Sequence, residues 1–206
     1  MATAGPPGID KLVPFEVPLY GTKLAGFEAH HAALRSVVLR LRDSTKGRAT
    51  SLRGGWQSST ELHSIEDPSL AWIRTKMHAF ARLALAGTYA NWAATDLETV
   101  GFWANVSGRG AWHTPHHHLP SNWSSVVYID VEASIAPNDT AALIEFINPI
   151  PFPASFAQPS AVAYAPSNGL AFLFPGALTH MVNPNATDAE RISMSFNFSV
   201  TPKRSA

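Results

Sequence analysis

The first half of the chain has two stretches in which hydrophobic residues recur every three or four positions. The first stretch lies between Lys23 and about Asp43 and comprises Leu24, Phe27, His31, Leu34, Val38 and Leu41. The second follows Asp67 and Pro68, an N-cap residue with proline at the first helical position, and ends near Gly87. Its apolar positions are Leu70, Ile73, Met77, Phe80 and Ala84. This period predicts two amphipathic helices, each with one face packed in a core.

Beyond residue 95 the pattern changes to short runs of Val, Ile, Phe and Tyr, separated by Pro, Gly, Asn and Ser. These runs predict strands at 97–106, 123–132, 141–147, 160–165, 169–174 and 190–200. Residues 11–20, which carry two prolines, predict an edge strand, and 51–58 a glycine-rich turn. Many short strands indicate an antiparallel sandwich or barrel.

The expected fold class is therefore α+β and mainly β, with two N-terminal helices packed on a jelly roll. With 206 residues and 46% hydrophobic content, one domain over 1–206 is expected. Its helical part would span about 1–95 and its jelly-roll core about 96–200.

Composition excludes several functions. Fifteen basic and fifteen acidic residues cancel, and no basic cluster indicates a nucleic-acid partner. No apolar run approaches the roughly 20 residues that span a bilayer. The absence of cysteine removes disulfides, zinc–thiolate sites, iron–sulfur clusters and cysteine nucleophiles. Residues 1–10 show neither a basic nor an apolar segment, so we expect no secretory signal, no glycosylation of the five Asn-x-Ser/Thr sequons and a cytoplasmic location.

The candidate chemistry begins with a histidine tract, His113-Thr-Pro-His-His-His118, that runs into a predicted strand. Imidazoles two residues apart on an extended chain point to the same side, so His116 and His118 can share a metal ion. His117 would point away and His113 would lie in the preceding loop. His180 follows a second buried run, and two close ligands with one distant ligand are typical of an open catalytic metal site.

A second signal lies in the last strand. Arg191, Ser193, Ser195 and Asn197 share one face of it, opposite a face of Ile, Met and Phe. A buried guanidinium needs an anionic partner, for which a carboxylate is the natural choice. That carboxylate belongs either to a ligand or to one of the protein's own acids.

The order of these motifs resembles a family of small 2-oxoglutarate- and Fe(II)-dependent oxygenases with a double-stranded β-helix fold, related to the cupins. The resemblance covers roughly residues 50–200. It rests on Gly54-Gly-Trp-Gln-Ser58, Trp103-Ala-Asn-Val106, His116-x-His118 with Ser124-x-Val-x-Tyr128, Phe174-Pro-Gly…His180 and Arg191-Ile-Ser193.

The resemblance implies roles for individual residues. His116 and His180 match the two metal-binding histidines of the fold, and His118 stands where most members have Asp or Glu. Three neutral imidazoles still bind Fe(II), as in the three-histidine cupin dioxygenases. Asp130, the nearest acidic residue, lies twelve positions past His118, and we do not expect it to reach the metal. The cofactors implied are Fe(II) and 2-oxoglutarate.

The cosubstrate would be held by four residues. Arg191 and Ser193 match the pair that grips the distal carboxylate of 2-oxoglutarate, and Tyr128 and Asn105 match inward polar positions that help to hold it. With dioxygen, the enzyme would form succinate and CO2 and abstract a hydrogen atom from its substrate, giving hydroxylation, desaturation or cyclisation. The substrate is expected to be a small molecule such as an amino acid or related metabolite.

Two further features of the chain have more than one interpretation. Trp103, Trp112, Trp123 and Phe174 flank the motifs and can line a pocket or pack in the core, and we expect core for at least two of them. The edge strands of such folds often pair, which leaves room for a homodimer.

Two other functions fit parts of the pattern. A cupin-type dioxygenase with three histidines and no 2-oxoglutarate would use Arg191 to bind a carboxylate of its substrate. A non-catalytic jelly-roll binding module would hold zinc in a closed four-ligand shell, which requires no buried anion receptor. The sequence contains no Gly-x-Ser-x-Gly elbow, Walker loop or Gly-x-Gly-x-x-Gly turn.

Overall fold

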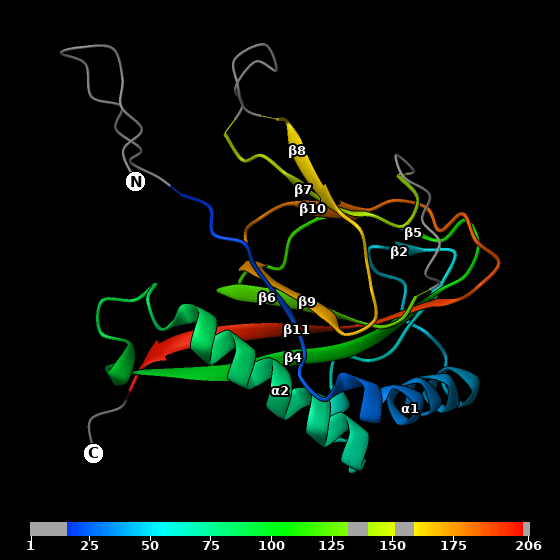
Figure 1. The fold of residues 1–206 in the computed structure, drawn as a ribbon, viewed down its shortest axis with the longest axis horizontal. Helices are drawn as coiled ribbons and strands as arrows, with labels where there is room; N and C mark the ends of the chain where they lie inside the picture. Colours follow the sequence, from blue (N-terminus) through cyan, green and yellow to red (C-terminus); the bar gives the residue numbers. More distant parts are fainter. Residues whose placement is uncertain (1–15, 132–139, 151–158, 204–206) are drawn as a thin grey trace.

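The computed structural model describes residues 16–131, 140–150 and 159–203 (Figure 1). Its two helices are α1 (His31–Ser44) and α2 (Pro68–Leu85), with short 3-10 turns η1 (Phe27–Ala29), η2 (Leu62–Ser64) and η3 (Trp92–Ala94). The strands are β1 (Tyr20–Lys23), β2 (Leu52–Arg53), β3 (Trp56–Gln57), β4 (Thr95–Ser107), β5 (Trp112–His116), β6 (Trp123–Asp130), β7 (Ile144–Ile147), β8 (Ala161–Tyr164), β9 (Leu170–Pro175), β10 (His180–Val182) and β11 (Arg191–Pro202). Within these ranges no helix is long and apolar enough to cross a membrane.

The strands form two antiparallel sheets that face each other across the molecule. One sheet has six strands in the order β1-β9-β6-β11-β4-β3, and the other has five in the order β2-β5-β10-β7-β8. Figure 1 shows α1 and α2 against the outer face of the six-stranded sheet, on the side away from the second sheet. The expected mainly-β fold, a jelly roll with two N-terminal helices packed on it, is confirmed.

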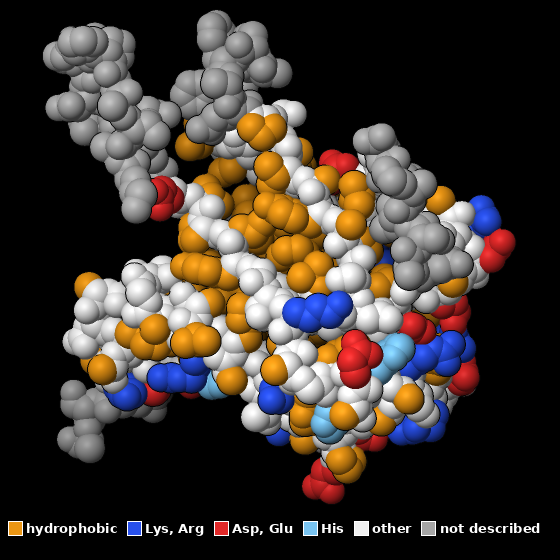
Figure 2. Space-filling view, in the orientation of Figure 1, with side chains coloured by type: hydrophobic (Ala, Val, Ile, Leu, Met, Phe, Trp, Pro, Cys, Tyr) orange, Lys and Arg blue, Asp and Glu red, His pale blue; other side chains and the backbone are white. Residues whose placement is uncertain are grey.

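The alternation along β11 explains this layering. Ile192, Met194, Phe196 and Phe198 are fully buried in the core between the helices and the six-stranded sheet. The alternate positions of β11 face the second sheet, where a smaller core includes Phe146, Phe172 and Phe174. Figure 2 shows hydrophobic side chains gathered between the two sheets on the viewed side of the molecule. Because successive side chains of a strand point to opposite faces, one strand serves both the core and the interior of the jelly roll.

The second helix forms as its sequence predicts. The Asp67 carboxylate accepts hydrogen bonds from the backbone N–H groups of Ser69 at 2.8 Å and Leu70 at 3.3 Å, and Pro68 occupies the first turn. This cap satisfies two N–H groups that would otherwise lack partners at the helix start.

The first helix begins later than expected. Residues predicted to open it form β1 and η1 instead, and α1 starts only at His31. Gly26 interrupts the pattern with a backbone φ of 79°, a left-handed conformation that a helix cannot contain. The expected edge strand is present as β1 at Tyr20–Lys23, past both prolines, and pairs with β9; residues 11–15 of the prediction lie outside the described residues.

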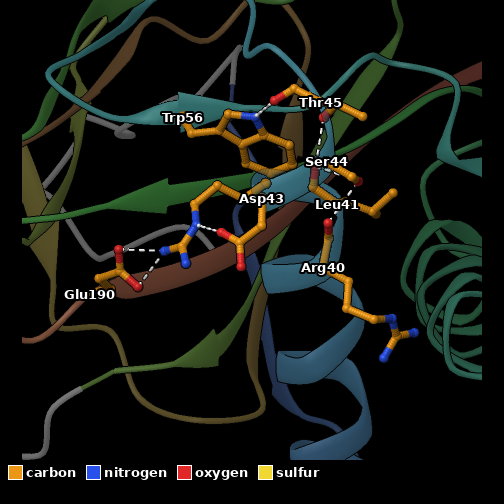
Figure 3. Close-up of polar contacts among 8 residues, drawn as sticks. Arg40, Leu41, Asp43, Ser44, Thr45, Trp56 and Glu190 are labelled. Atoms are coloured by element: carbon orange, nitrogen blue, oxygen red, sulfur yellow. Dashed lines mark hydrogen bonds and ion pairs between the residues drawn. The ribbon is translucent and has the colours of Figure 1, made fainter.

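The end of α1 is hydrogen-bonded to residues at two strands of the six-stranded sheet, β3 and β11. Arg42 donates to both carboxylate oxygens of Glu190 at 2.6 Å, directly before β11. The indole of Trp56 on β3 donates to the carbonyl oxygen of Thr45 at 3.2 Å, and both contacts are drawn in Figure 3. These bonds fix the position of β3 and the start of β11 relative to the helix.

Six of the observed strands correspond to the segments predicted beyond residue 95. Two strands were not predicted there, β5 and β10, and both border the cavity described below. β5 is short and mostly polar, and β10 has only three residues, so neither shows the apolar run or alternation by which strands are found in a sequence.

Candidate functional site

A cavity of about 320 Å³ lies between the two sheets. It is lined from the six-stranded sheet by β4, β6, β9 and β11, and from the other sheet by β5, β7 and β10. All seven residues predicted to bind metal or cosubstrate line it: Asn105, His116, His118, Tyr128, His180, Arg191 and Ser193. The fold therefore brings together positions that are up to 88 residues apart in the chain.

Three histidines come close enough at one end of the cavity to share an ion. His116, the last residue of β5, lies directly opposite His180, the first residue of β10, with ring centroids 4.3 Å apart. His118 lies two residues past the end of β5, and its ring centroid is 5.1 Å from that of His116 and 5.0 Å from that of His180. One ring nitrogen from each of the three lies within 4.8 Å of the others, so the group could hold a metal ion.

Backbone hydrogen bonds set the tautomer of two of these rings. The Nδ1 atom of His116 donates to the carbonyl oxygen of Thr114 at 2.7 Å, and that of His180 to the carbonyl oxygen of Leu178 at 2.9 Å. A carbonyl only accepts, so Nδ1 carries the proton in each neutral ring and Nε2 keeps its lone pair. Such bonds are the usual means by which a protein orients a metal-binding imidazole.

The surroundings also keep the three imidazoles neutral. Burial lowers the pKa of His118 to about 3 and that of His180 to about 4, with further lowering from the neighbouring histidines. The pKa of His116 is lowered by burial too, opposed by its bond to Thr114. Neutral imidazole is the form that binds a metal, so the rings are available as ligands near pH 7 without losing a proton.

A fourth histidine lies in the same cavity. His113 belongs to β5, so the prediction that it lies in the preceding loop is wrong. In the pairing of β5 with β10, His180 lies opposite His116 and Val182 lies opposite His113. A shift of two residues along β10 therefore corresponds to a shift of three residues along β5. This bulge reverses the alternation, and the His113 ring stacks beside that of His116 with centroids 6.0 Å apart.

Arg191 lines the same cavity and is buried without a counter-ion among the described residues. Its side chain is 4% exposed, and its Nη1 donates to the carbonyl oxygen of Ala142 at 3.1 Å. It forms no ion pair within the described residues, so the alternative of a salt bridge to one of the protein's own acids finds no partner there. Burial lowers the pKa of the guanidinium, and the nearby Tyr128 opposes the shift. A buried guanidinium requires an anionic partner, and none of the described residues supplies one to Arg191.

Other buried polar atoms around Arg191 also lack partners. Arg191 Nε, the Tyr128 hydroxyl and Asn105 Oδ1 are all buried without a hydrogen bond to the described part of the chain. All three residues line the cavity. Burial raises the pKa of Tyr128 to about 12, so its hydroxyl keeps its proton and can donate. Because nearly all buried polar groups in folded proteins are bonded, this cluster indicates a polar ligand.

The remaining polar candidates have structural contacts. Asp130 accepts from Arg35 at 2.6 Å and lies 3.3 Å from His31, both on α1, and it does not line the cavity. It is therefore tied to the helix and does not replace a missing carboxylate beside the histidines. His117 is exposed, and its Nδ1 accepts from the backbone N–H of Leu119 at 3.3 Å.

The four flanking aromatic residues divide between cavity and core. Trp103 and Phe174 line the cavity, with ring centroids 5.5 Å and 6.5 Å from that of His118. Trp123 lies in the core beneath the helices, and its indole donates to the Tyr89 hydroxyl at 2.8 Å. Trp112 is partly buried and lies outside the cavity.

Sequence reasoning assigned no role in this site to several polar residues that line it, and two of them are informative. One is His113, which only the bulge turns inward. The other is Gln57 on β3, which follows the Gly54-Gly55 turn and whose Oε1 accepts from the Thr50 hydroxyl at 2.5 Å. A Cβ on Gly55 would come within 2.6 Å of the carbonyl oxygen of Val106, so the turn needs glycine to bring β3 against β4. The Gly-Gly pair next to a polar residue is the signal in the sequence that could have identified Gln57.

Comparison with known proteins agrees with this geometry. Residues 101–197 match the model of the family described as "Putative 2OG-Fe(II) oxygenase". No curated protein sequence matches the chain.

Solved structures share the fold at low sequence identity. They include a Pseudomonas putida prolyl-4-hydroxylase (TM-score 0.61, 14% identity, 91% of this chain and 93% of that one). HygX from Streptomyces hygroscopicus, solved with nickel and 2-oxoglutarate bound, has a TM-score of 0.63 at 11% identity, covering 89% and 83%. The 2-oxoglutarate-dependent carbocyclase SnoK from nogalamycin biosynthesis has a TM-score of 0.63 at 14% identity, covering 90% and 81%.

The family match over residues 101–197, the shared fold and the histidine cluster together indicate a 2-oxoglutarate/Fe(II)-dependent oxygenase with Fe(II) and 2-oxoglutarate as cofactors. They favour this function over the two alternatives from the sequence, the dioxygenase without 2-oxoglutarate and the zinc-stabilised binding module.

Proposed function

We propose that the cavity is the active site and that the protein oxidises a small molecule by hydrogen-atom abstraction. The observation that carries the proposal is the arrangement of two unlike groups in one cavity. Three neutral imidazoles converge in it, and a buried guanidinium that has no counter-ion among the described residues lines it too. A metal ion and a dicarboxylate would satisfy both groups together.

In this proposal His116, His118 and His180 hold Fe(II). Their ring nitrogens are neutral, converge, and in two rings are oriented by backbone carbonyls. Three imidazoles carry no charge, so the bound ion keeps its full positive charge where the usual carboxylate ligand would reduce it. This site would leave coordination positions for the cosubstrate and dioxygen, as other open iron sites do.

Arg191, Ser193, Tyr128 and Asn105 are proposed to hold 2-oxoglutarate. Arg191 Nε and the Tyr128 hydroxyl are two donors without partners, and a carboxylate is the acceptor that matches a guanidinium. Ser193 lies directly opposite Tyr128 in the pairing of β11 with β6, and opposite Asn105 in the pairing with β4. The strand pairing therefore brings residues of three adjacent strands together, where their side chains would contact one carboxylate.

His113 is proposed as a further contact to the same cosubstrate. Its Nδ1 lies 3.3 Å from the Ser51 hydroxyl, and it lines the cavity next to His116 with Arg191 close enough to lower its pKa. A neutral ring whose Nδ1 accepts from Ser51 carries its proton on Nε2 and can donate it to a carboxylate oxygen. His113 would thus help to orient the cosubstrate between the histidines and Arg191.

When bound, the iron and 2-oxoglutarate supply the oxidising chemistry, with succinate and CO2 as products. The residues of this chain position the reactants and exclude water, since the cavity is enclosed by both sheets. Related folds serve different outcomes, because the structural neighbours include a hydroxylase and a carbocyclase. We propose hydroxylation, desaturation or cyclisation of a small molecule as the outcome here.

The proposal is tested by replacing Arg191 with Ala. The variant should lose conversion of 2-oxoglutarate to succinate while still binding iron, because Arg191 touches the cosubstrate and not the metal. Arg109→Ala is a matched control, since Arg109 is an exposed arginine paired with Asp188 outside the cavity. Unchanged succinate formation in Arg191→Ala would refute the proposed cosubstrate site.

A further inference from the structure

The cavity continues beyond the proposed cosubstrate site along β11. Arg191 and Ser193 are each 4% exposed, whereas Ser195 and Asn197, on the same face, are partly exposed. Trp103 lies opposite Ser195 in the strand pairing, and its ring lies next to that of His118. The half of the cavity around Trp103, Ser195 and Asn197 therefore opens toward solvent and adjoins the histidine cluster. We call it the outer subsite.

The outer subsite contains hydrogen-bonding groups that the protein leaves free. The Trp103 indole N–H has no partner in the described residues, and Ser195 Oγ receives only a 3.5 Å contact from Asn105 Nδ2. The Asn197 amide contacts the Ser124 hydroxyl at 3.0 Å, and Ser124 also lies 3.3 Å from the Phe196 carbonyl oxygen. In either orientation of the amide at least one N–H of Asn197 remains unpaired. The three side chains that carry these donors all line the cavity that contains the histidine cluster.

The charged residues near the outer subsite indicate which charge its ligand can carry. None of the described side chains that line the cavity is acidic, so a substrate ammonium would find no counter-ion there. The one guanidinium that lines it, Arg191, lies at the buried end and is taken by the cosubstrate. Arg48 and Arg53 near the rim are exposed and donate to the protein's own oxygens, those of Thr60 and of the backbone at Thr50.

We propose that the outer subsite binds the primary substrate, and that this substrate is a neutral, oxygen-bearing small molecule. Its hydroxyl, ether or carbonyl oxygens would accept from Trp103, Ser195 and Asn197, next to the carbon that is oxidised. This inference rests on the proposed function, because it places the substrate beside the histidine-bound iron. We therefore favour an uncharged polyol, sugar or amide as the substrate over the amino acid expected from the sequence. The cavity of about 320 Å³ is shared with the cofactors, so the bound portion is small.

The test uses the full chain loaded anaerobically with Fe(II) and 2-oxoglutarate. The probes are myo-inositol, glucose and N-acetylglycinamide as neutral compounds, and L-proline, L-lysine and L-aspartate as charged ones, at equal concentrations. The readouts are the shift of the visible charge-transfer band and the quenching of tryptophan fluorescence. At least one neutral probe should shift the band, and the charged probes should leave it unchanged.

Two variants connect the response to the subsite. Asn197→Ala removes the amide, and Trp103→Phe removes the indole N–H but keeps a ring. Each should weaken binding of the responding probe by about 5- to 10-fold, the value of one hydrogen bond, with the affinity for 2-oxoglutarate unchanged. Thr201→Ala, an exposed position on the same strand outside the cavity, is the control.

The possible failures are distinguishable. Absence of the band from the unmodified protein would refute the proposed function itself. A band that responds to charged probes alone, or to no neutral probe, would overturn the substrate class. An equal loss of 2-oxoglutarate affinity in Asn197→Ala would show that the subsite belongs to the cosubstrate.

Discussion

His116 and His180 lie directly opposite each other on antiparallel β5 and β10, with ring centroids 4.3 Å apart and both Nδ1 atoms bonded to carbonyl oxygens of their own strand or turn. The pairing of two short strands, rather than side-chain packing, thus sets the distance between two rings that are 64 residues apart in sequence. The backbone of the two strands thus holds two candidate metal ligands next to each other.

Replacing either of these histidines should remove the metal. We expect His180→Ala to weaken Fe(II) binding by more than about 100-fold, because loss of a direct ligand exceeds the 10- to 100-fold effect typical of an outer-shell change. His117→Ala, in which the neighbouring exposed histidine is removed, is the control and should bind iron normally. The measurement is anaerobic Fe(II) titration. Tight binding in His180→Ala would contradict the ligand assignment.

The third histidine can be exchanged for the carboxylate that is usual at its position. His118→Asp should keep iron and 2-oxoglutarate binding, whereas His118→Ala should lose both, because aspartate restores a ligand and alanine does not. The dissociation constants of Fe(II) and 2-oxoglutarate for both variants provide the comparison. Equal behaviour of the aspartate and alanine variants would mean that residue 118 is not a ligand.

The Arg191 side chain should lower the free energy of unfolding when the cavity holds no anion. Replacing it with Met removes a buried guanidinium that has no counter-ion in the described part of the chain, so the metal-free variant should be more stable by about 1–3 kcal/mol. Addition of 2-oxoglutarate with a metal ion should raise the melting temperature of the unmodified protein and leave that of the variant unchanged. A destabilised variant that still responds to 2-oxoglutarate would contradict this role.

Replacing His113 should weaken the binding of 2-oxoglutarate more than the binding of Fe(II). His113→Phe fills the same space without a hydrogen-bond donor and should weaken 2-oxoglutarate binding by about 10-fold, as expected for one bond to a charged group. His113→Gln retains a donor and should recover part of the affinity. Binding of 2-oxoglutarate followed at saturating Fe(II) separates this effect from loss of metal. Equal affinities in the phenylalanine variant and the unmodified protein would exclude the contact.

The buried histidines should make the metal-free protein sensitive to acid. The pKa of His180 is lowered to about 4 in the fold, whereas an unfolded chain has a value of about 6.5. As pH falls below about 6.5 the unfolded state takes up the proton first, so the free energy of unfolding decreases until about pH 4 and is unaffected above 6.5. At pH 5 this amounts to about 2 kcal/mol for His180.

Urea denaturation of the metal-free protein at pH 7.5 and pH 5 measures that effect. His180→Asn cannot take up the proton and should lose about 2 kcal/mol less than the unmodified protein between the two pH values. An identical loss in both proteins would show that His180 does not titrate as described.

Much of the fold followed from patterns that span whole elements. The period of α2 and its Asp67 cap, and the alternation along β11, depend on local chemistry and are visible in the sequence. The same alternation placed Arg191 on the inner face. Its lack of an acidic partner is a tertiary property, which the sequence left open between a ligand and an internal salt bridge.

The details that sequence patterns missed depend on pairing between distant segments. Strand β5 is mostly polar and β10 has only three residues, and they are stabilised by pairing with each other and with β2 and β7 rather than by their own composition. The bulge that turns His113 inward exists only in that pairing. Before α1, the left-handed backbone conformation of Gly26 makes the helix begin later than the hydrophobic repeat predicts.

The central claim is that one cavity binds iron through three histidines and 2-oxoglutarate through Arg191. It is tested most directly by an anaerobic visible spectrum of the metal-free protein titrated with Fe(II) and then with 2-oxoglutarate. We predict a charge-transfer band that appears only with both, is absent in His180→Ala and is lost or greatly weakened in Arg191→Ala. Iron binding without the band in the unmodified protein, or a band of full intensity in both variants, would contradict the claim.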